Sequence, residues 1–193
     1  MRTPTWRRSV SLRGRQVTLR TARPGDQSAL ERLRADPEID HFMGVEGPAA
    51  TLLWRHVYLG DQSGALADLV VAGPRDEPIG LVSLWDRPIP QEAAEISIWV
   101  GQGHRDEGKG TEALRLALRY AFGDLKLHKV YLRVLAYNAR AIRAYQKAGF
   151  RPEGTLREEM RVDGQWHDLL YMGVLAPEFA DLEAAAEDGA PPG

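Results

Sequence analysis

The sequence predicts a mixed α/β fold in which helices flank a central sheet. Several short segments alternate apolar and polar residues, as half-buried strands do, for example residues 16–22 and 129–135. Between them, apolar residues recur at three- and four-residue intervals, as on the buried face of a helix. A glycine-rich turn, Arg105-Asp-Glu-Gly108-Lys-Gly110, joins a strand-like run to a helix-like run.

In the first half of the chain, residues 16–22 form the first expected strand. Asp26 then caps a helix whose apolar residues follow at helical spacing as far as Ile39. A second helix comes next, and then two strands that turn residues join into a hairpin; these segments are residues 51–59, 67–72 and 79–85.

In the second half, residues 95–100 are expected to form a central strand that leads into the glycine-rich turn. The helix after the turn starts at Thr111 and ends near Gly123, and Asn138 caps another helix that runs to about Ala148. The remaining strands are residues 129–135, a strand that begins at Phe150, and a hairpin of residues 160–161 and 167–174 around Asp163-Gly164.

The length of 193 residues and the hydrophobic content of 44% suit one domain with a sizeable core. We expect this domain over residues 16–178. The arginine-rich residues 1–15 form a basic arm before it, and residues 179–193, rich in Ala, Glu, Gly and Pro, form a disordered acidic tail after it.

Composition also argues against several classes of function. A formal net charge of −2 gives no general attraction to nucleic acid or to an anionic membrane, so a nucleic-acid-binding module acting through the basic arm is a weak alternative. The chain has no cysteine and no apolar run long enough for a membrane span, which fits a cytoplasmic protein. Its five histidines show no metal-ligand spacing, so we expect no catalytic metal.

The glycine-rich turn before a helix is typical of a phosphate site, because the first helical N–H groups lack partners within the helix. A P-loop does not fit well, since Gly110 stands where a magnesium-binding hydroxyl should be. A dinucleotide fingerprint also fits poorly, because several residues separate the turn from its strand and the next strand ends without a carboxylate.

Two segments resemble the GNAT acetyltransferases. Arg105-x-x-Gly108-x-Gly110 is similar to the cofactor signature of that superfamily. Asn138-x-x-Ala-x-x-x-Tyr145-x-Lys-x-Gly-Phe150 is similar to its second conserved segment, about thirty residues later. The resemblance covers residues 16–177 and looks closest to the branch with ribosomal-protein N-terminal, spermidine and some antibiotic acetyltransferases. It implies the GNAT acyl-CoA N-acyltransferase fold, with a mostly antiparallel central sheet and one splayed strand pair.

The resemblance further implies an enzyme that transfers acetyl from acetyl-CoA directly to a primary amine. Backbone groups of the central strand would pair with the pantetheine arm, and amides of the glycine-rich turn would hold the pyrophosphate. The residues that it places at the cofactor are Ile98, Trp99, Val100, Arg105, Gly108, Lys109, Gly110, Thr111, Asn138, Ala141 and Lys147.

The resemblance gives Tyr145 the role of the general acid that protonates the departing thiolate; alone, this tyrosine could equally pack in the core. Glu95 is the candidate base, directly or through water, although strand alternation puts it on the face of Ser97 and Trp99. A solvated strand-end carboxylate is the competing interpretation. The other candidate bases are Asp168, Glu158, Glu159 and a water path.

The acceptor pocket is less defined by the sequence. Phe42, Met43, Trp85 and Tyr171 are candidate acceptor-binding residues, although each could be ordinary core. The acceptor is the amine of a small molecule or a peptide or protein N-terminus. A homodimer is compatible with the resemblance, and a non-catalytic coenzyme A-binding sensor of the same fold is the alternative function.

Overall fold

The structure is a computed structural model, and it describes residues 9–43, 65–86 and 92–187. These residues build an eight-stranded sheet with the order β1-β2-β3-β4-β5-β6-β8-β7. The strands are β1 (Ser11–Arg13), β2 (Thr18–Thr21), β3 (Ala65–Ala72), β4 (Pro78–Asp86), β5 (Ala93–Val100), β6 (Lys129–Leu135), β7 (Arg151–Val162) and β8 (Gln165–Leu175). The helices are α1 (Gln27–Arg34), α2 (Pro37–Met43), α4 (Lys109–Gly123), α5 (Ala139–Lys147) and α6 (Ala176–Glu187).

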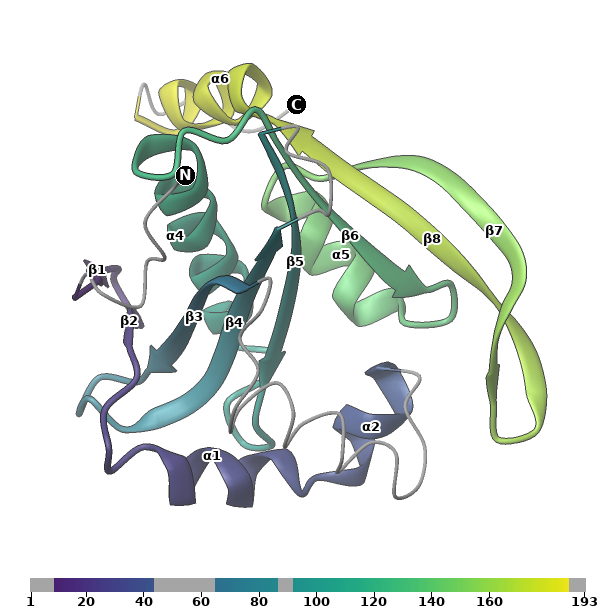
Figure 1. Ribbon diagram of the computed structural model, residues 1–193, viewed down its shortest axis with the longest axis horizontal. Coiled ribbons are helices and arrows are strands. Elements are labelled where there is room, and N and C mark those ends of the chain that lie inside the picture. The colour runs from purple at the N-terminus through teal and green to yellow at the C-terminus, as the bar shows by residue number, and fades with distance from the viewer. Residues whose placement is uncertain (1–8, 44–64, 87–91, 188–193) are drawn as a thin grey trace.

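Helices cover both faces of this sheet (Figure 1). On one face, α4 and α5 pack over the main core, in which Val82, Ile96 and Leu132 are buried. On the other face, α1 and α2 pack over a smaller core that contains Leu30, Ile39 and Trp99. Because successive strand residues point to opposite faces, each central strand contributes to both cores. We call these the α4–α5 face and the α1–α2 face.

One strand pair in the middle of the sheet comes apart. All neighbouring strands pair antiparallel except β5 and β6, which are parallel. Within the described chain, β5 pairs with β6 only through its first three residues, Ala93, Ala94 and Glu95. The strands then separate, as Figure 1 shows between the labels β5 and β6. The splayed pair that the sequence resemblance implies is therefore present.

The first expected helix is divided into two. The sequence predicted one helix as far as Ile39, but α1 ends at Arg34 and α2 begins at Pro37. Proline has no N–H for the helical ladder and restricts the residue before it, so the helix stops there. The carboxylate of Asp36 then accepts a hydrogen bond from the N–H of Glu38, at 3.0 Å. This break turns α2 toward the central strands.

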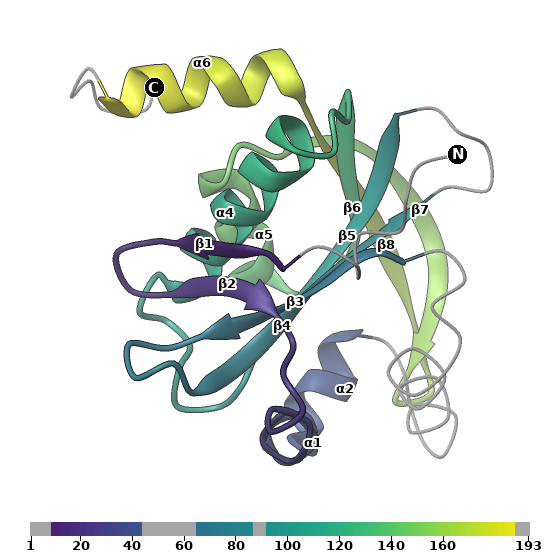
Figure 2. The same ribbon diagram turned by 60° about the vertical axis from the view of Figure 1, so that its left-hand side comes forward.

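Both ends of the expected domain were placed wrongly. Residues 11–13 of the supposed basic arm form β1 and pair with β2, and Val10 and Leu12 pack on the core. The supposed disordered tail is helical as far as Glu187, because α6 buries Phe179 against Phe122. Alanine and glutamate are strong helix formers, and Leu182 also packs on the core while Glu183 pairs with Arg119 of α4. Figure 2 shows α6 lying beside α4.

Other predictions are confirmed. Strand β6 has the expected bounds, and Asn138 caps α5 by accepting from the N–H of Ala141 at 3.1 Å. Asp163 and Gly164 both have positive φ, as a tight two-residue hairpin turn requires. The helix expected over residues 51–59 lies outside the described residues. Among the described helices, none is long and apolar enough to cross a membrane.

A buried ion pair fixes α1 to the sheet. Asp26 occupies the N-cap position of α1, but its side chain does not cap the helix as the sequence predicted. It accepts hydrogen bonds from both terminal nitrogens of Arg20, at 2.7 and 2.9 Å, and from the N–H of Arg23. The hydrogen bonds from Arg20 lower the pKa of Asp26, although burial opposes this shift. The same guanidinium binds Asp76 in the β3–β4 turn.

We expect Asp26→Asn to lower the free energy of unfolding at pH 7 by about 2 kcal/mol, because a charged hydrogen bond within a buried pair is lost. A carboxyl with a lowered folded-state pKa stabilises above its unfolded pKa, and this stabilisation is lost as the pH falls through the folded pKa. The difference between the two proteins should therefore shrink below about pH 4. Urea unfolding at pH 7 and pH 3.5 measures it, with the exposed Asp124→Asn as control. An equal difference at both pH values would contradict the assignment.

Candidate active site

A cavity of about 730 Å³ passes through the gap between β5 and β6. Residues of both sheet faces line it: Ile98 and Leu114 on the α4–α5 face, and Ser97 and Arg133 on the α1–α2 face. Two substrates can therefore approach the same point from opposite sides of the sheet. The cavity joins the two segments that carry the family resemblance. Its lining includes Gly108, Gly110 and Thr111 of the first segment and Asn138, Ala141, Tyr145 and Lys147 of the second.

The first turn of α4 faces this cavity with backbone N–H groups that have no partner among the described residues. Gly108 is the N-cap residue with φ of 80°, and no side chain caps the helix. The first helical hydrogen bond runs from the N–H of Glu112 to the carbonyl of Gly108, so the N–H groups of Lys109, Gly110 and Thr111 precede it. At the positive end of the helix dipole, these groups suit a pyrophosphate.

The free edge of β5 offers a second set of backbone groups. The N–H of Gly101 donates to Ile79 of β4, so the alternation of an antiparallel pair directs Trp99 toward β4 and Ile98 and Val100 toward the gap. The backbone of Trp99, expected to bind the cofactor, thus points to β4, although Trp99 is among the residues that line the cavity. Its indole packs instead in the smaller core on the α1–α2 face.

Arg105 has a structural partner for each part of its guanidinium. Nε donates to the carbonyl of Val100 at 2.7 Å, and the terminal nitrogens bind Glu38 at 2.5 Å and Asp36 at 2.6 Å. The side chain is 12% exposed. Its positive charge is thus compensated by α2 and the turn before it, and only the backbone of Arg105 stays a candidate for the pyrophosphate.

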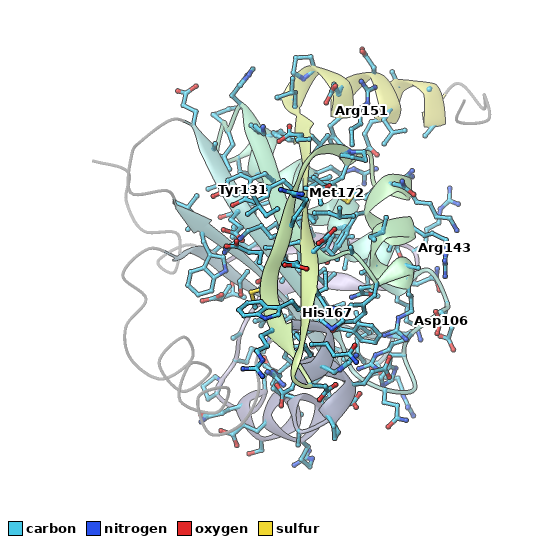
Figure 3. All side chains as sticks on the ribbon, turned by 90° about the vertical axis from the view of Figure 1, so that its right-hand side faces the viewer. Asp106, Tyr131, Arg143, Arg151, His167 and Met172 are labelled. Atoms are coloured by element: carbon cyan, nitrogen blue, oxygen red, sulfur yellow. The ribbon has the colours of Figure 1, made fainter. Side chains whose placement is uncertain are left out.

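Other cations stand nearer to the cofactor end of the cavity. Lys109 forms an ion pair with Glu107, whereas Arg143 and Lys147 of α5 line the cavity. Figure 3 shows Arg143 and Asp106 on the same side of the molecule, beside α5. Arg143 was not selected from the sequence. Its distance of five residues from Asn138 could have suggested it, but many exposed arginines have such spacing.

Tyr145 lines the cavity from α5, with its ring packed edge-on against Phe150 at a centroid distance of 5.9 Å. Burial raises the pKa of Tyr145 to about 12. The phenol therefore stays protonated at any working pH and has a proton to donate. Transfer of that proton to a thiolate of pKa about 8.5 is uphill by roughly 5 kcal/mol, so a short, oriented contact in the bound state has to offset this cost.

Glu95 lies on the α1–α2 face with Ser97, as strand alternation predicted. Its Oε1 accepts a hydrogen bond from Nε of Arg133 at 2.8 Å, and both side chains line the cavity. This hydrogen bond raises the pKa of Arg133. The sequence did not identify Arg133, although its place on β6, two residues after the Glu95 partner Tyr131, puts it on that face.

Three of the four candidate acceptor residues line the cavity, namely Phe42, Met43 and Trp85. Tyr171 is not among the lining residues; it lies opposite Arg133 on β8 and stacks on Tyr131. Asp168, an alternative base, accepts from the N–H of Glu158 where the β7–β8 register shifts. Within the described segments, no group of three His, Cys, Asp or Glu side chains is placed to hold a metal ion.

Comparison with known proteins identifies related chains. A model of the acetyltransferase (GNAT) domain matches residues 16–151. The chain is 29% identical over 169 residues to a spermidine N(1)-acetyltransferase of Vibrio cholerae serotype O1, which covers 85% of this chain and 95% of the relative. It is 26% identical over 159 residues to an L-amino acid N-acetyltransferase of Escherichia coli K12, covering 81% and 96%.

The fold is also similar to solved structures. The spermidine N-acetyltransferase from Vibrio cholerae in complex with CoA and spermine superposes with a TM-score of 0.72 at 29% sequence identity. The match covers 86% of this chain and 98% of that chain. The arrangement of helices and strands around the split sheet is therefore shared.

We expect Gly110→Leu to weaken coenzyme A binding by about tenfold or more, at least ~1.4 kcal/mol. A Cβ at residue 110 meets its nearest neighbour, Cγ2 of Val100, at 3.8 Å, so the new side chain fits the protein but occupies the phosphate approach. Gly108 is a poorer test, since its positive φ strains any other residue.

Calorimetric titration with coenzyme A measures this effect, and thermal unfolding checks the fold. Gly123→Leu, at the other end of α4 with open space around its Cβ, is the matched control. Equal affinity of the Gly110 variant and the wild type would place the pyrophosphate elsewhere.

Proposed function

Because the chain belongs to the GNAT acetyltransferase family, we propose that it acetylates the α-amino group of an amino acid or of a peptide N-terminus. The protein is an acetyl-CoA-dependent N-acetyltransferase, and the proposal concerns its acceptor and the roles of its residues. Its relatives are named as acetyltransferases, which favours an enzyme over a non-catalytic coenzyme A-binding sensor. The paired charges of Glu95 and Arg133 carry the acceptor assignment.

The residues at the α4–α5 side fit acetyl-CoA. The uncapped N-terminus of α4 holds the pyrophosphate through the N–H groups of Gly110 and Thr111, and Arg143 and Lys147 add positive charge nearby. The edge of β5, at Ile98 and Val100, offers backbone groups to the pantetheine arm. The co-substrate supplies an acetyl thioester, and the Val100 N–H serves as the donor to its carbonyl oxygen.

Tyr145 supplies the proton to the departing sulfur. Its position in α5, at the wall of the gap, and its protonated phenol suit this role. The phenol does not need to be a strong acid for this, because a hydrogen bond that strengthens as charge develops on sulfur lowers the barrier.

The charges on the acceptor side argue against a polycation. The two carboxylates there are engaged: Glu95 by Arg133, and Glu38 by Arg105 and Arg140. With Arg143 and Lys147 assigned to the cofactor side, Arg105, Arg133 and Arg140 are the described arginines that neutralise these two carboxylates. A polyamine carries several ammonium groups and needs unpaired carboxylates for each. An acceptor whose amine lies close to a carbonyl or carboxylate instead matches this adjacent pair. Its ammonium group faces Glu95, and its carbonyl or carboxylate oxygen faces Arg133.

The proton affinity of the acceptor favours the same assignment. An α-amino group with pKa of about 8 loses its proton at pH 7 for roughly 1.4 kcal/mol, whereas a lysine-like amine with pKa of about 10.4 costs about 4.6 kcal/mol. Arg133 binds one oxygen of Glu95, and the other oxygen can hold one ammonium group and take its proton, directly or through water. The less basic α-amine needs less free energy for this proton transfer to Glu95.

We expect acetyl transfer to short peptides with a free N-terminus, or to free amino acids, to exceed transfer to spermidine by about tenfold or more in kcat/KM. Glu95→Gln should lower kcat/KM for the preferred acceptor by about 100-fold, since a group that takes the proton is lost. Release of free coenzyme A thiol in a panel of amines measures both.

Glu153→Gln is the matched control, because Glu153 forms a similar ion pair with Lys129 at the surface. N-terminally blocked peptides control for lysine side chains in the panel. A preference for spermidine would reject the α-amine assignment while leaving the family membership intact, and full activity of the Glu95 variant would move the base to a water path.

We expect Tyr145→Phe to lower kcat by about 100-fold and leave the coenzyme A affinity within about twofold. The substitution removes only the hydroxyl, so the packing on Phe150 is kept. Because the pKa of Tyr145 lies near 12, the wild-type rate should show no limb from this residue below about pH 10. Steady-state kinetics across pH 6–10, with calorimetry of coenzyme A, checks both parts, and an unchanged kcat would remove the acid role.

A further inference from the structure

Three polar side chains form a row across the α1–α2 face of the sheet. Asp68 of β3 lies directly opposite Ser83 of β4, and Ser83 lies directly opposite Ser97 of β5. Directly opposed residues in antiparallel strands have Cβ atoms about 5 Å apart, within reach of hydrogen bonds between hydroxyls. The next row on this face, Val70, Leu81 and Trp99, is buried and apolar. The polar row therefore interrupts an apolar surface.

The row begins in the active-site cavity and ends beneath it. Ser97 and Ser83 both line the cavity, and Ser83 is only 3% exposed. Trp85, also in the cavity wall, donates its indole N–H to Oγ of Ser97 at 3.5 Å. Asp68 is not among the lining residues. A carboxyl group thus lies behind the cavity, with Ser83 and then Ser97 between it and the cavity in the register of the sheet.

Asp68 is incompletely satisfied in this position. Its Oδ1 is buried and has no hydrogen-bond partner among the described residues. Burial raises the pKa of Asp68, and the hydroxyl of Ser83 partly opposes this rise. A buried carboxyl oxygen without a partner among the described residues is costly, and such a group calls for an explanation.

Building on the amine acceptor proposed above, we propose that Asp68 is a positioning residue that acts through Ser83 to set the direction in which the Ser97 hydroxyl meets the acceptor amine. Neither serine changes its own charge. The ionisation of Asp68 decides which partner in each hydrogen bond is the donor.

With Asp68 ionised, the carboxylate can only accept, so the Ser83 hydroxyl donates to it. Ser97 then donates to Ser83, and a lone pair on Ser97 Oγ accepts an N–H of the acceptor amine. In this direction the nitrogen lone pair stays free for acetyl transfer.

With Asp68 protonated, the row reverses. The carboxyl donates to Ser83, Ser83 donates to Ser97, and the Ser97 hydroxyl donates into the cavity. Its natural acceptor there is the lone pair of the amine, which is then no longer free to react. The active direction therefore requires ionised Asp68, and turnover should rise as the pH rises through its pKa.

The other charged groups on this face are already paired. Each forms an ion pair with a partner of opposite charge within the described residues: Arg20 with Asp26 and Asp76, Arg34 with Asp40, and Glu95 with Arg133. Their charges are compensated locally, so the row is governed mainly by Asp68 itself.

The test is the pH dependence of kcat for the wild type, Asp68→Asn and Ser83→Ala, with two acceptors whose amine pKa values differ. The limb due to the acceptor moves when the acceptor is changed, and the limb due to Asp68 does not. We expect this second limb in the wild type, above the range of an ordinary aspartate, and its loss in both variants. Ser83→Ala should also lower kcat by about 3- to 10-fold, the value of one hydrogen bond.

Asp124→Asn is the matched control, since Asp124 is exposed at the end of α4. Glu95, as the proposed base, also gives a limb that does not move with the acceptor, and Glu95→Gln identifies it by removing it. A further acceptor-independent limb that remains in Glu95→Gln and persists in Asp68→Asn overturns the proposal. A limb that is lost in Asp68→Asn but kept in Ser83→Ala also overturns it, because Asp68 would then act without the row. If Asp68→Asn fails to fold, as thermal unfolding would show, Ser83→Ala alone decides.

These outcomes are separate from the choice of acceptor. Any amine that the enzyme acetylates, including spermidine, is enough for the pH profiles, so a failure of the α-amine assignment does not prevent the test. Carboxyl ¹³C shifts give a readout without substrate: a signal missing in Asp68→Asn reports its titration, and Ser83→Ala should raise that pKa. An unshifted pKa would contradict the contact on which the row depends.

Discussion

The early end of the β5–β6 pairing is the constraint on which the rest of the molecule depends. Only three residues of β5 pair with β6, and beyond Glu95 the edges of both strands lose their partners within the sheet. Unpaired backbone N–H and C=O groups are costly to bury unless another group satisfies them. The gap therefore provides a place where a ligand with amide groups can complete the sheet, and it lets side chains from both faces meet at one cavity.

Arg105 fixes the end of β5, beside this gap, to the elements around it. It connects the end of β5, through the Val100 carbonyl, to Asp36 and Glu38, and Arg140 of α5 binds the other oxygen of Glu38. One carboxylate thus links the glycine-rich turn, α2 and α5, which are the walls of both substrate sites. A guanidinium suits this junction better than an ammonium, because its planar donors reach three acceptors in fixed directions.

The two sides of the cavity differ in how far their charges are compensated. On the acceptor side, carboxylates and arginines neutralise one another, whereas the cofactor side keeps Arg143, Lys147 and the positive end of α4. A polyanionic co-substrate and a small amine can thus occupy the same cavity without competing for the same groups. Tyr145 and the Asp68 row lie on opposite faces of the sheet, so in the proposed mechanism the leaving group and the amine have separate polar partners.

The sequence by itself determined the local elements, including those that carry the candidate cofactor site. Residues 129–135, the Asn138 cap and the turn at Gly108 and Gly110 were predictable, because periodicity, capping and glycine conformation act over a few residues. Tertiary structure decided the rest. Contact with Phe122 stabilises the helix in the expected tail, and the side chain of Arg105 binds α2 and the carbonyl of Val100. Strand register brings Glu95 next to Arg133 and places Asp68 in one row with Ser97. Apart from the contact of Arg105 with Val100, these contacts link residues about 15 to 70 positions apart, and a local pattern cannot specify a partner that only the packing of the sheet brings near.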